Sequence, residues 1–260
     1  MSNALIINDD TSGVRRITLN RPERMNALDG ELLGALNRAI LDCADSDRDI
    51  RVIVITGSGR AFCAGNDLKW LASGILSDPA AHQRHQDLMQ DTYLALEAAK
   101  QIVIASVNGY AVAGGFEMAL ACDIIVASDE AEMGDEHMRR NLLPSGGSSQ
   151  RLPRLVGLSR AMFYLVTGRR MTGREAERIG LASLAVPAAS LEAATMELAT
   201  EIARADAGAL ASMKFLARRA LELPLKDGLA MERWTQYRYR TSSPSLEAGV
   251  RNFAERTPTR

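Results

Sequence analysis

The sequence has few cysteines, no excess of charge of either sign and no long apolar run. Its three cysteines, Cys43, Cys63 and Cys122, are an odd number without paired spacing. This pattern argues against a disulfide-stapled secreted domain and predicts a reducing cytoplasm. The 31 basic and 32 acidic residues leave a formal net charge of −1. We expect neither a nucleic acid nor an anionic membrane as a partner, because such surfaces need a clustered positive excess.

The first ten residues contain neither a basic n-region nor a long apolar stretch. We therefore expect no secretion signal and no segment that spans a bilayer. The 260 residues are 47% hydrophobic and 24% charged, which is ordinary for a globular protein with a large core. This length fits one large α/β domain, or a core with an appendage.

Short apolar runs in the first half of the chain predict buried strands. Residues 5–8 and 14–20 read as a β-hairpin, and Asp29 is placed to cap a helix with an apolar face from Leu32 to Ile40. Continuous apolar runs follow at 52–55, 102–107 and 124–126. Runs of this kind are typical of strands buried on both faces, so strand–turn–helix units predict an α/β fold with mainly parallel strands.

The second half of the chain is predicted to be mostly helical. Ser159 is a candidate cap for a helix that Gly168 can end. Thr172 and Glu175 have the spacing of a capping box, and Gly180 marks the end of that helix. From Ser190 onward there is no strand signal. We expect a core over residues 1–195 and a helical region over 196–260.

Two glycine-rich segments follow buried strands, at residues 61–69 and 108–117. Gly114 and Gly115 precede a segment of helical composition, and amides at a helix start are bare and carry partial positive charge. If the loops face each other, the amides of Asn66 and Gly114 can converge on one oxygen and stabilise a carbonyl that gains charge. The spacing alone also fits glycines that only make tight turns.

These segments resemble the crotonase, or enoyl-CoA hydratase/isomerase, superfamily along nearly the whole chain. The matching stretches, in chain order, are 20–22 with 26–28, 62–69, 108–123, 143–147 with 150–152, and 167–169 with 176–181. The resemblance implies a spiral of ββα units, a helical C-terminal subdomain used in trimer assembly, and coenzyme A thioester substrates. It also implies an oxyanion hole at the amides of Asn66 and Gly114.

Glu117 matches the first catalytic glutamate of the family's hydratases, where a carboxylate activates water. The sequence departs from the family at the second glutamate, whose position holds His137. An imidazole can still move a proton at neutral pH, and Asp135 or Glu136 is placed to orient it. The alternatives are that Glu117 is a surface carboxylate at a helix start and that His137 only lines the pocket.

The resemblance also implies a set of residues that bind coenzyme A. Lys69 and Arg24 match positions near its phosphates and adenine, where cations pair with phosphate oxygens. The backbone at 66–68 is implied to bind the adenine ring. The full set of coenzyme A-binding residues is Arg24, Ala27, Ala64, Asp67, Leu68 and Lys69. Either cation is alternatively a solvated surface charge.

Other patterns predict no chemistry. His82 and His85, three apart on a polar helix without a third ligand nearby, are expected on a solvated face rather than in a metal site. Cys63 is expected to be an inert buried thiol. Ser145 and Ser148 lack the spacing of a nucleophile elbow.

The function predicted is reversible addition of water to a 2-enoyl-CoA, with Glu117 activating water and His137 delivering a proton. No metal or redox cofactor is expected, because coenzyme A arrives with the substrate. A homotrimer or dimer of trimers is implied. The alternatives are an isomerase, a C–C or thioester hydrolase of the same superfamily that uses His137 as a base, and a non-catalytic assembly or binding member.

Overall fold

The structure, a computed structural model, describes residues 4–10, 12–45, 49–243, 245, 247 and 249–251. Contacts divide the chain into two units, Met1–Ala203 and Arg204–Arg260. Helix α8 (Leu191–Ala203), which spans the expected boundary after residue 195, packs on strands of the first unit. In the described part of the chain, no helix combines the length and the apolar character that crossing a bilayer requires.

The first unit contains two sheets. The larger has the strand order β1-β2-β3-β5-β7-β10 and the smaller has the order β4-β6-β8-β9. The strands of the larger sheet are β1 (Leu5–Asp9), β2 (Val14–Leu19), β3 (Val52–Gly57), β5 (Ile102–Val107), β7 (Ile124–Ser128) and β10 (Leu184–Val186). Those of the smaller sheet are β4 (Ala61–Cys63), β6 (Tyr110–Val112), β8 (Glu132–Gly134) and β9 (Met171–Thr172).

Successive strand pairs alternate between the two sheets, which makes the spiral. The pairs β3–β4, β5–β6 and β7–β8 each place their first strand in the larger sheet and their second in the smaller one. Helices α3 (Pro79–Ala98) and α4 (Gly114–Ala121) return the chain from one pair to the next. The predicted α/β fold with ββα units is therefore confirmed, as are the hairpin β1–β2 and the three buried parallel strands.

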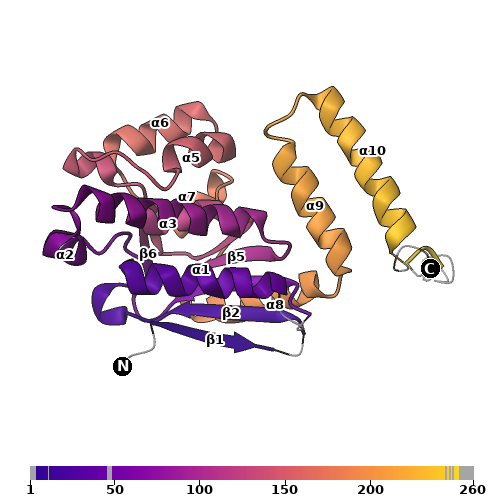
Figure 1. The fold of residues 1–260 in the computed structure, drawn as a ribbon, viewed down its shortest axis with the longest axis horizontal. Coiled ribbons are helices and arrows are strands. Elements are labelled where there is room, and N and C mark those ends of the chain that lie inside the picture. The colour runs from indigo at the N-terminus through magenta and orange to yellow at the C-terminus, as the bar shows by residue number, and fades with distance from the viewer. Residues whose placement is uncertain are drawn as a thin grey trace. The chain divides into compact units, whose positions relative to one another are not determined.

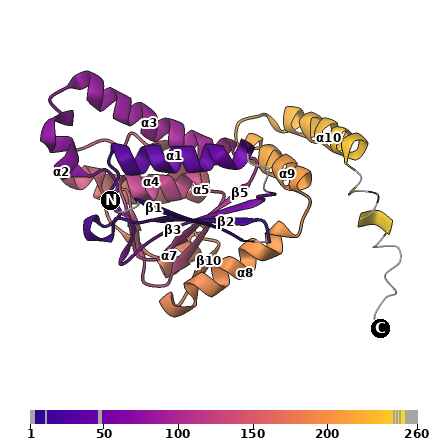
Figure 2. The same ribbon diagram turned by 60° about the horizontal axis from the view of Figure 1, so that its bottom comes forward.

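Helices cover both faces of the larger sheet, as Figure 2 shows for α1 (Gly30–Asp45) and α3 on one side and α8 on the other. Alternate residues of β3 divide between these faces, as the pleat requires. Ile53 and Ile55 belong to the cluster shared with α1, α3 and α4, whereas Val52 and Val54 pack with Leu191 of α8. The sheet is therefore buried on both sides, which explains its continuous apolar strands.

The other α-helices in the described residues of the first unit are labelled in Figure 1. They are α5 (Ser148–Val156), α6 (Leu158–Thr167) and α7 (Gly173–Arg178), with the short α2 (Leu68–Trp70) earlier in the chain. Asp29 Oδ1 accepts from Leu32 N at 2.9 Å, and Thr172 with Glu175 forms the predicted capping box. The cap predicted at Ser159 is wrong. Gly157, at φ 81°, separates α5 from α6 and begins the second helix two residues earlier.

The second unit contains α9 (Ala207–Arg219) and α10 (Leu225–Ser242), which contact each other. Asp206 caps α9 through a 2.9 Å bond from Ala209 N. Within its described residues this unit is helical, as predicted for the C-terminal region.

Candidate active site

Two loops meet where adjacent parallel strands of the smaller sheet end. Strand β4 pairs with β6 in parallel, so the segments that follow them emerge on the same edge. Gly65, at φ 81°, lies so close to the second loop that a Cβ there would stand 2.7 Å from Gly114 N. No other residue fits this position without moving the loops apart. The structure thus brings together the two glycine-rich segments.

The directions of the Asn66 and Gly114 amides follow from the carbonyl groups of the residues before them. The Gly65 carbonyl accepts from Leu28 N at 2.8 Å, and the Ala113 carbonyl accepts from Glu117 N at 3.0 Å within α4. In a trans peptide the N–H points opposite to the C=O. The Asn66 N–H therefore points away from Leu28, and the Gly114 N–H points out of the start of α4. Neither amide donates a hydrogen bond to another described residue.

Ala113 sets the orientation of the Gly114 amide at an energetic cost. Its backbone lies at φ 49° and ψ −123°, a region that non-glycine residues rarely occupy. Such a conformation costs on the order of 1–3 kcal/mol and is found most often at functional sites. The strain is held by two bonds, from Ala113 N to Gly134 O and from Glu117 N to Ala113 O, both 3.0 Å.

Glu117 lies one turn into α4 and is 1% exposed. Its Oε1 accepts from Ser148 N at 3.1 Å, whereas its Oε2 is buried and has no hydrogen-bond partner among the residues that the structure describes. Burial raises the pKa of the Glu117 carboxyl, although the Ser148 amide and the charge of His137 oppose the rise. A buried carboxylate with one fixed and one unpaired oxygen is suited to taking a proton.

His137 begins a short 3₁₀ helix (His137–Arg140), and its Nδ1 lies 2.9 Å from Asp135 Oδ2. Asp135 is 1% exposed. Its own burial opposes ionisation, but the bonds from His137 and Ser148 outweigh it and lower the Asp135 pKa. Burial likewise opposes the imidazolium, yet the bond to Asp135 and the nearby charges raise the His137 pKa. An ionised Asp135 fixes the proton on Nδ1 and leaves Nε2 for chemistry.

Of the two acidic residues just before His137, Asp135 is the one that contacts its ring. The Glu136 carboxylate is instead paired with Arg170 at 2.7 Å and Arg139 at 3.1 Å. Glu136 also has a left-handed backbone at φ 56°, which separates its side chain from those on either side.

Ser148 links the two proton-transfer groups, a role that its sequence context did not indicate. Its amide donates to Glu117, and its hydroxyl donates to Asp135. The residue is fully buried at the start of α5. Glu117, Ser148, Asp135 and His137 thus form one hydrogen-bonded chain, which comes from three separate segments.

The segments implied to bind coenzyme A also lie side by side. Leu28 bridges Asn66 in parallel, and Ala64 N donates to Met25 O at 3.0 Å. This places Arg24 and Ala27 along the loop that holds Ala64 and Leu68. Arg24 and Lys69 are exposed.

Asp67 has a structural use that the sequence did not indicate. Its carboxylate caps α2 through bonds from Lys69 N and Trp70 N, both 3.1 Å, and it pairs with Arg21 at 3.1 Å. Burial opposes ionisation of Asp67, but the bond from Trp70 N and the pairing with Arg21 outweigh it and lower the Asp67 pKa.

The predicted solvated face for His82 and His85 is wrong for His85, which is 4% exposed. The three-residue spacing on a polar helix could not show that this turn of α3 packs on the first loop. Its Nε2 lies 2.9 Å from Asn66 Oδ1. Cys63 is buried as predicted, and burial raises the pKa of its thiol to about 12.

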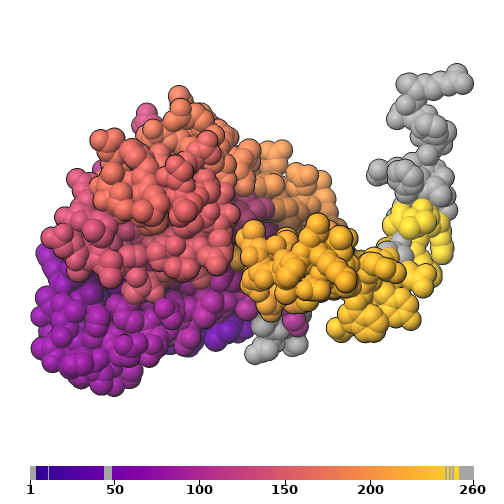
Figure 3. Space-filling model, turned by 90° about the horizontal axis from the view of Figure 1, so that it is seen from above, coloured from indigo at the N-terminus to yellow at the C-terminus, as the bar shows by residue number. Residues whose placement is uncertain are grey.

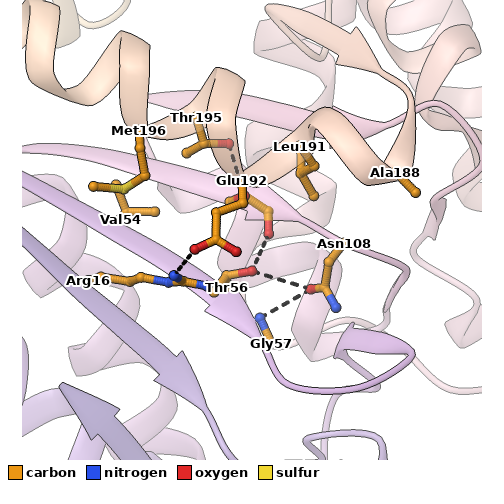
Figure 4. Close-up of a pocket in the computed structure, with 11 residues that line it drawn as sticks. Arg16, Val54, Thr56, Gly57, Asn108, Ala188, Leu191, Glu192, Thr195 and Met196 are labelled. Atoms are coloured by element: carbon orange, nitrogen blue, oxygen red, sulfur yellow. Dashed lines mark hydrogen bonds and ion pairs between the residues drawn. The ribbon is translucent and has the colours of Figure 1, made fainter. Parts of the chain in front are cut away.

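A cavity of about 190 Å³ lies under α8, on the face of the larger sheet turned away from α4 (Figure 4). Its lining includes Val54, which points away from the cluster that contains α4. Thr56 Oγ1 donates to Ser106 O at 2.9 Å, and the Ser106 and Thr195 hydroxyls lie 3.0 Å apart. These polar groups bind one another and join α8 to the sheet, separate from Glu117.

A ββα spiral whose strand pairs alternate between two sheets is the architecture of a crotonase-type α/β protein. The sequence model of the family described as enoyl-CoA hydratase/isomerase matches residues 9–260. The chain belongs to this family.

Named relatives and solved structures cover most of the chain. A probable enoyl-CoA hydratase of Mycobacterium bovis is 39% identical over 88% of this chain and 86% of its own. The 2,3-dehydroadipyl-CoA hydratase of Escherichia coli is 37% identical over 84% and 83%. A crystal structure of enoyl-CoA hydratase from Bacillus anthracis is 32% identical and superposes with a TM-score of 0.92 over 99% and 98%.

Proposed function

We propose that this protein is an enoyl-CoA hydratase, which adds water reversibly to a 2-enoyl-CoA. The observation that carries the proposal is the hydrogen-bonded chain from Glu117 through Ser148 and Asp135 to His137. Hydration needs one group to take a proton from water and another to give a proton to carbon. The candidate site holds two such groups, together with two amides that donate to no other described residue.

In the proposed mechanism the thioester oxygen accepts from the amides of Asn66 and Gly114. Glu117 takes a proton from water as its oxygen bonds to C3, and the double-bond electrons move to form an enolate. The amides stabilise this charge, and one such donor typically contributes about 3–4 kcal/mol. His137, protonated at Nε2, then delivers its proton to C2. Solvent returns both groups to their starting states.

The direct test is to mix the purified protein with crotonyl-CoA and follow loss of the conjugated thioester absorbance. We expect saturable loss and one deuterium at C2 when the reaction runs in heavy water, because the enolate takes its proton from exchangeable groups. Absence of turnover with short, long and aromatic enoyl thioesters would contradict hydration.

The Asp135–His137 pair favours a second candidate, a hydrolase of the same family. An imidazole bonded to a buried carboxylate through Nδ1 is also the arrangement of a general base. Cleavage of a β-keto thioester without hydration of crotonyl-CoA would select this candidate. Deuterium entering C2 with no change in absorbance would indicate an isomerase or a stalled enolate instead.

A homotrimer or dimer of trimers is the proposed assembly. The odd number of cysteines, three without paired spacing, agrees with a reducing cytoplasm. Each unit exposes large apolar side chains, which mark association surfaces. In the first unit α6 lies on an outer surface (Figure 3) and exposes Leu158, Met162, Phe163 and Val166. In the second unit α10 exposes Trp234 and Tyr237.

We expect sedimentation equilibrium to give three or six times the chain mass. Trp234→Glu should shift the protein toward smaller species, because a charge on an apolar interface is costly. Gln236→Glu, also exposed and on the same helix, is the matched control and should leave the mass unchanged. A monomeric natural protein would contradict the proposed assembly.

A further inference from the structure

One face of α3 touches both loops that carry the unpaired amides. His85, Met89 and Tyr93 follow each other at four-residue spacing and are all buried. Side chains at this spacing lie along one face of a helix. His85 Nε2 lies 2.9 Å from the side-chain oxygen of Asn66, and the Tyr93 hydroxyl donates to the Gly114 carbonyl at 2.7 Å. A single rigid helix thus contacts both amide-bearing residues.

Stability alone does not explain a histidine at position 85. The ring is 4% exposed and lies edge-on to Trp70, with centroids 4.8 Å apart, an environment that suits an apolar side chain. Within the described part of the chain, its buried Nδ1 has no hydrogen-bond partner. An unpaired buried polar atom is unfavourable, so the 2.9 Å contact with Asn66 is the evident gain from histidine here. Residues that break a local rule in this way tend to mark functional sites.

The contact with Asn66 restrains a peptide that glycine would otherwise leave free. Gly65 has a positive φ and no side chain, so little intrinsic preference holds the Gly65–Asn66 peptide. The Gly65 carbonyl is held by Leu28 on one side. His85 holds the Asn66 side chain on the other, with Nε2–H donating to Oδ1. The Leu28 carbonyl also accepts from Asp67 N at 2.9 Å, so the bond from His85 adds a side-chain restraint to two backbone restraints on the direction of the Asn66 amide.

We propose that His85 is a positioning residue that, together with Tyr93, sets the spacing and direction of the two amides that bind the thioester oxygen. The inference rests on the proposed oxyanion site and adds a residue that acts through Asn66 rather than on the substrate. Misplacing a hydrogen-bond donor weakens it most where charge develops, in the transition state. Loss of His85 should therefore lower kcat and leave KM little changed.

The test uses His85→Leu in the full-length protein, with His82→Leu as the matched control. His82 lies one turn earlier on α3, is partly exposed, and contacts Gln86 at 3.1 Å. We expect His85→Leu to reduce kcat with crotonyl-CoA on the order of 10- to 100-fold. His82→Leu should retain the natural rate. An unchanged kcat in His85→Leu would overturn the inference.

A double-variant cycle separates positioning from general damage to the fold. If His85 acts through Asn66, then Asn66→Ala should lower kcat to a similar extent, and His85→Leu should cause little further loss in that background. Equal losses from His85→Leu in both backgrounds would contradict the inference. If His85→Leu does not fold, Asn66→Ala and His85→Gln make the same test, because glutamine retains an N–H donor and should recover part of the rate.

A binding measurement distinguishes failure of this inference from failure of the proposed function. A chromophoric, conjugated aromatic enoyl thioester should absorb at longer wavelength when bound, because hydrogen bonds to its carbonyl polarise the conjugated system. We expect a smaller red shift with His85→Leu and the full shift with His82→Leu. A red shift that depends on His85 in a protein without hydratase turnover would support the positioning role and refute the hydratase. If the natural protein is an active hydratase and His85→Leu gives the same red shift as the natural protein, the hydratase is supported and the positioning role is refuted.

Discussion

Replacing Glu117 with glutamine is expected to lower kcat for hydration by about 100- to 10,000-fold. Glutamine has nearly the same shape and can keep the bond from Ser148 N through its carbonyl oxygen, so the site should retain its packing. It cannot take a proton from water. The measurement is the initial rate with crotonyl-CoA at saturation, together with the affinity for the substrate, which should change little.

The same variant should be at least as stable as the natural protein at neutral pH. Burial raises the Glu117 pKa in the folded state. A raised carboxyl pKa stabilises the folded state fully at pH values below the unfolded pKa. This stabilisation is lost as the pH rises through the folded pKa. Glutamine removes this loss, so the melting temperature should stay equal or rise. This pairing of lower activity with retained stability is typical of strained functional sites.

Glu192→Gln is the matched control for the Glu117 experiment. Glu192 lies on α8, its side chain is 68% exposed, and it forms an ion pair with Arg16 across the sheet from the site. Exposed pairs contribute little, so activity and melting temperature should both be unchanged. Full activity in Glu117→Gln would show that another group takes the proton from water.

The fold was predictable wherever a local pattern determines a local structure. The continuous apolar run at 52–55 predicted a strand covered on both faces, and α1 and α8 provide that cover. Gly114 predicted a helix start, and α4 begins there. The cap at Ser159 was missed because a positive-φ glycine, Gly157, can begin a helix without a side-chain cap. Serine has a higher propensity than glycine for the N-cap position of a helix, but the tight turn between α5 and α6 overrides this preference.

The site was predictable in its residues but not in its connections. The resemblance placed Glu117 and His137, but the partner of His137 depended on which of two neighbouring carboxylates turns toward it. The left-handed backbone of Glu136 decides this in favour of Asp135. Ser148 and His85 bond to residues 13 and 19 positions away along the chain. No periodicity in the sequence encodes a contact between a helix and a separate loop.

Asp135→Asn should lower kcat by about 100-fold or more, because the imidazole loses the partner that fixes its tautomer. Asparagine can turn its NH₂ group toward Nδ1, which then becomes the acceptor and moves the proton to Nε2. The imidazolium form of His137 would also lose its proton more readily, because a buried carboxylate no longer stabilises the cation. The variant should therefore deliver the proton to C2 poorly at every pH.

The pH profile gives this variant a signature that simple destabilisation would not produce. In the natural protein kcat/KM should fall at acid pH as Glu117 gains a proton, and at alkaline pH as His137 loses one. Burial acts to lower the His137 pKa, but the bond and charge of Asp135, with the charge of Glu117, outweigh burial and Arg140 and raise it. Removing the Asp135 charge leaves burial less opposed, so the alkaline limb should move to lower pH.

Glu136→Gln tests whether that shift belongs to Asp135 alone. Glu136 is one residue nearer to His137 in sequence than Asp135 and is also buried, but its carboxylate pairs with Arg170 and Arg139. In Glu136→Gln the alkaline limb of kcat/KM should lie at the same pH as in the natural protein, whatever the melting temperature of the variant. An equal shift in both variants would mean that the local net charge, rather than the Asp135–His137 bond, sets the protonation of the imidazole. His137 would then reach C2 without a fixed tautomer, and the hydrogen-bonded chain through Ser148 would have no part in the chemistry.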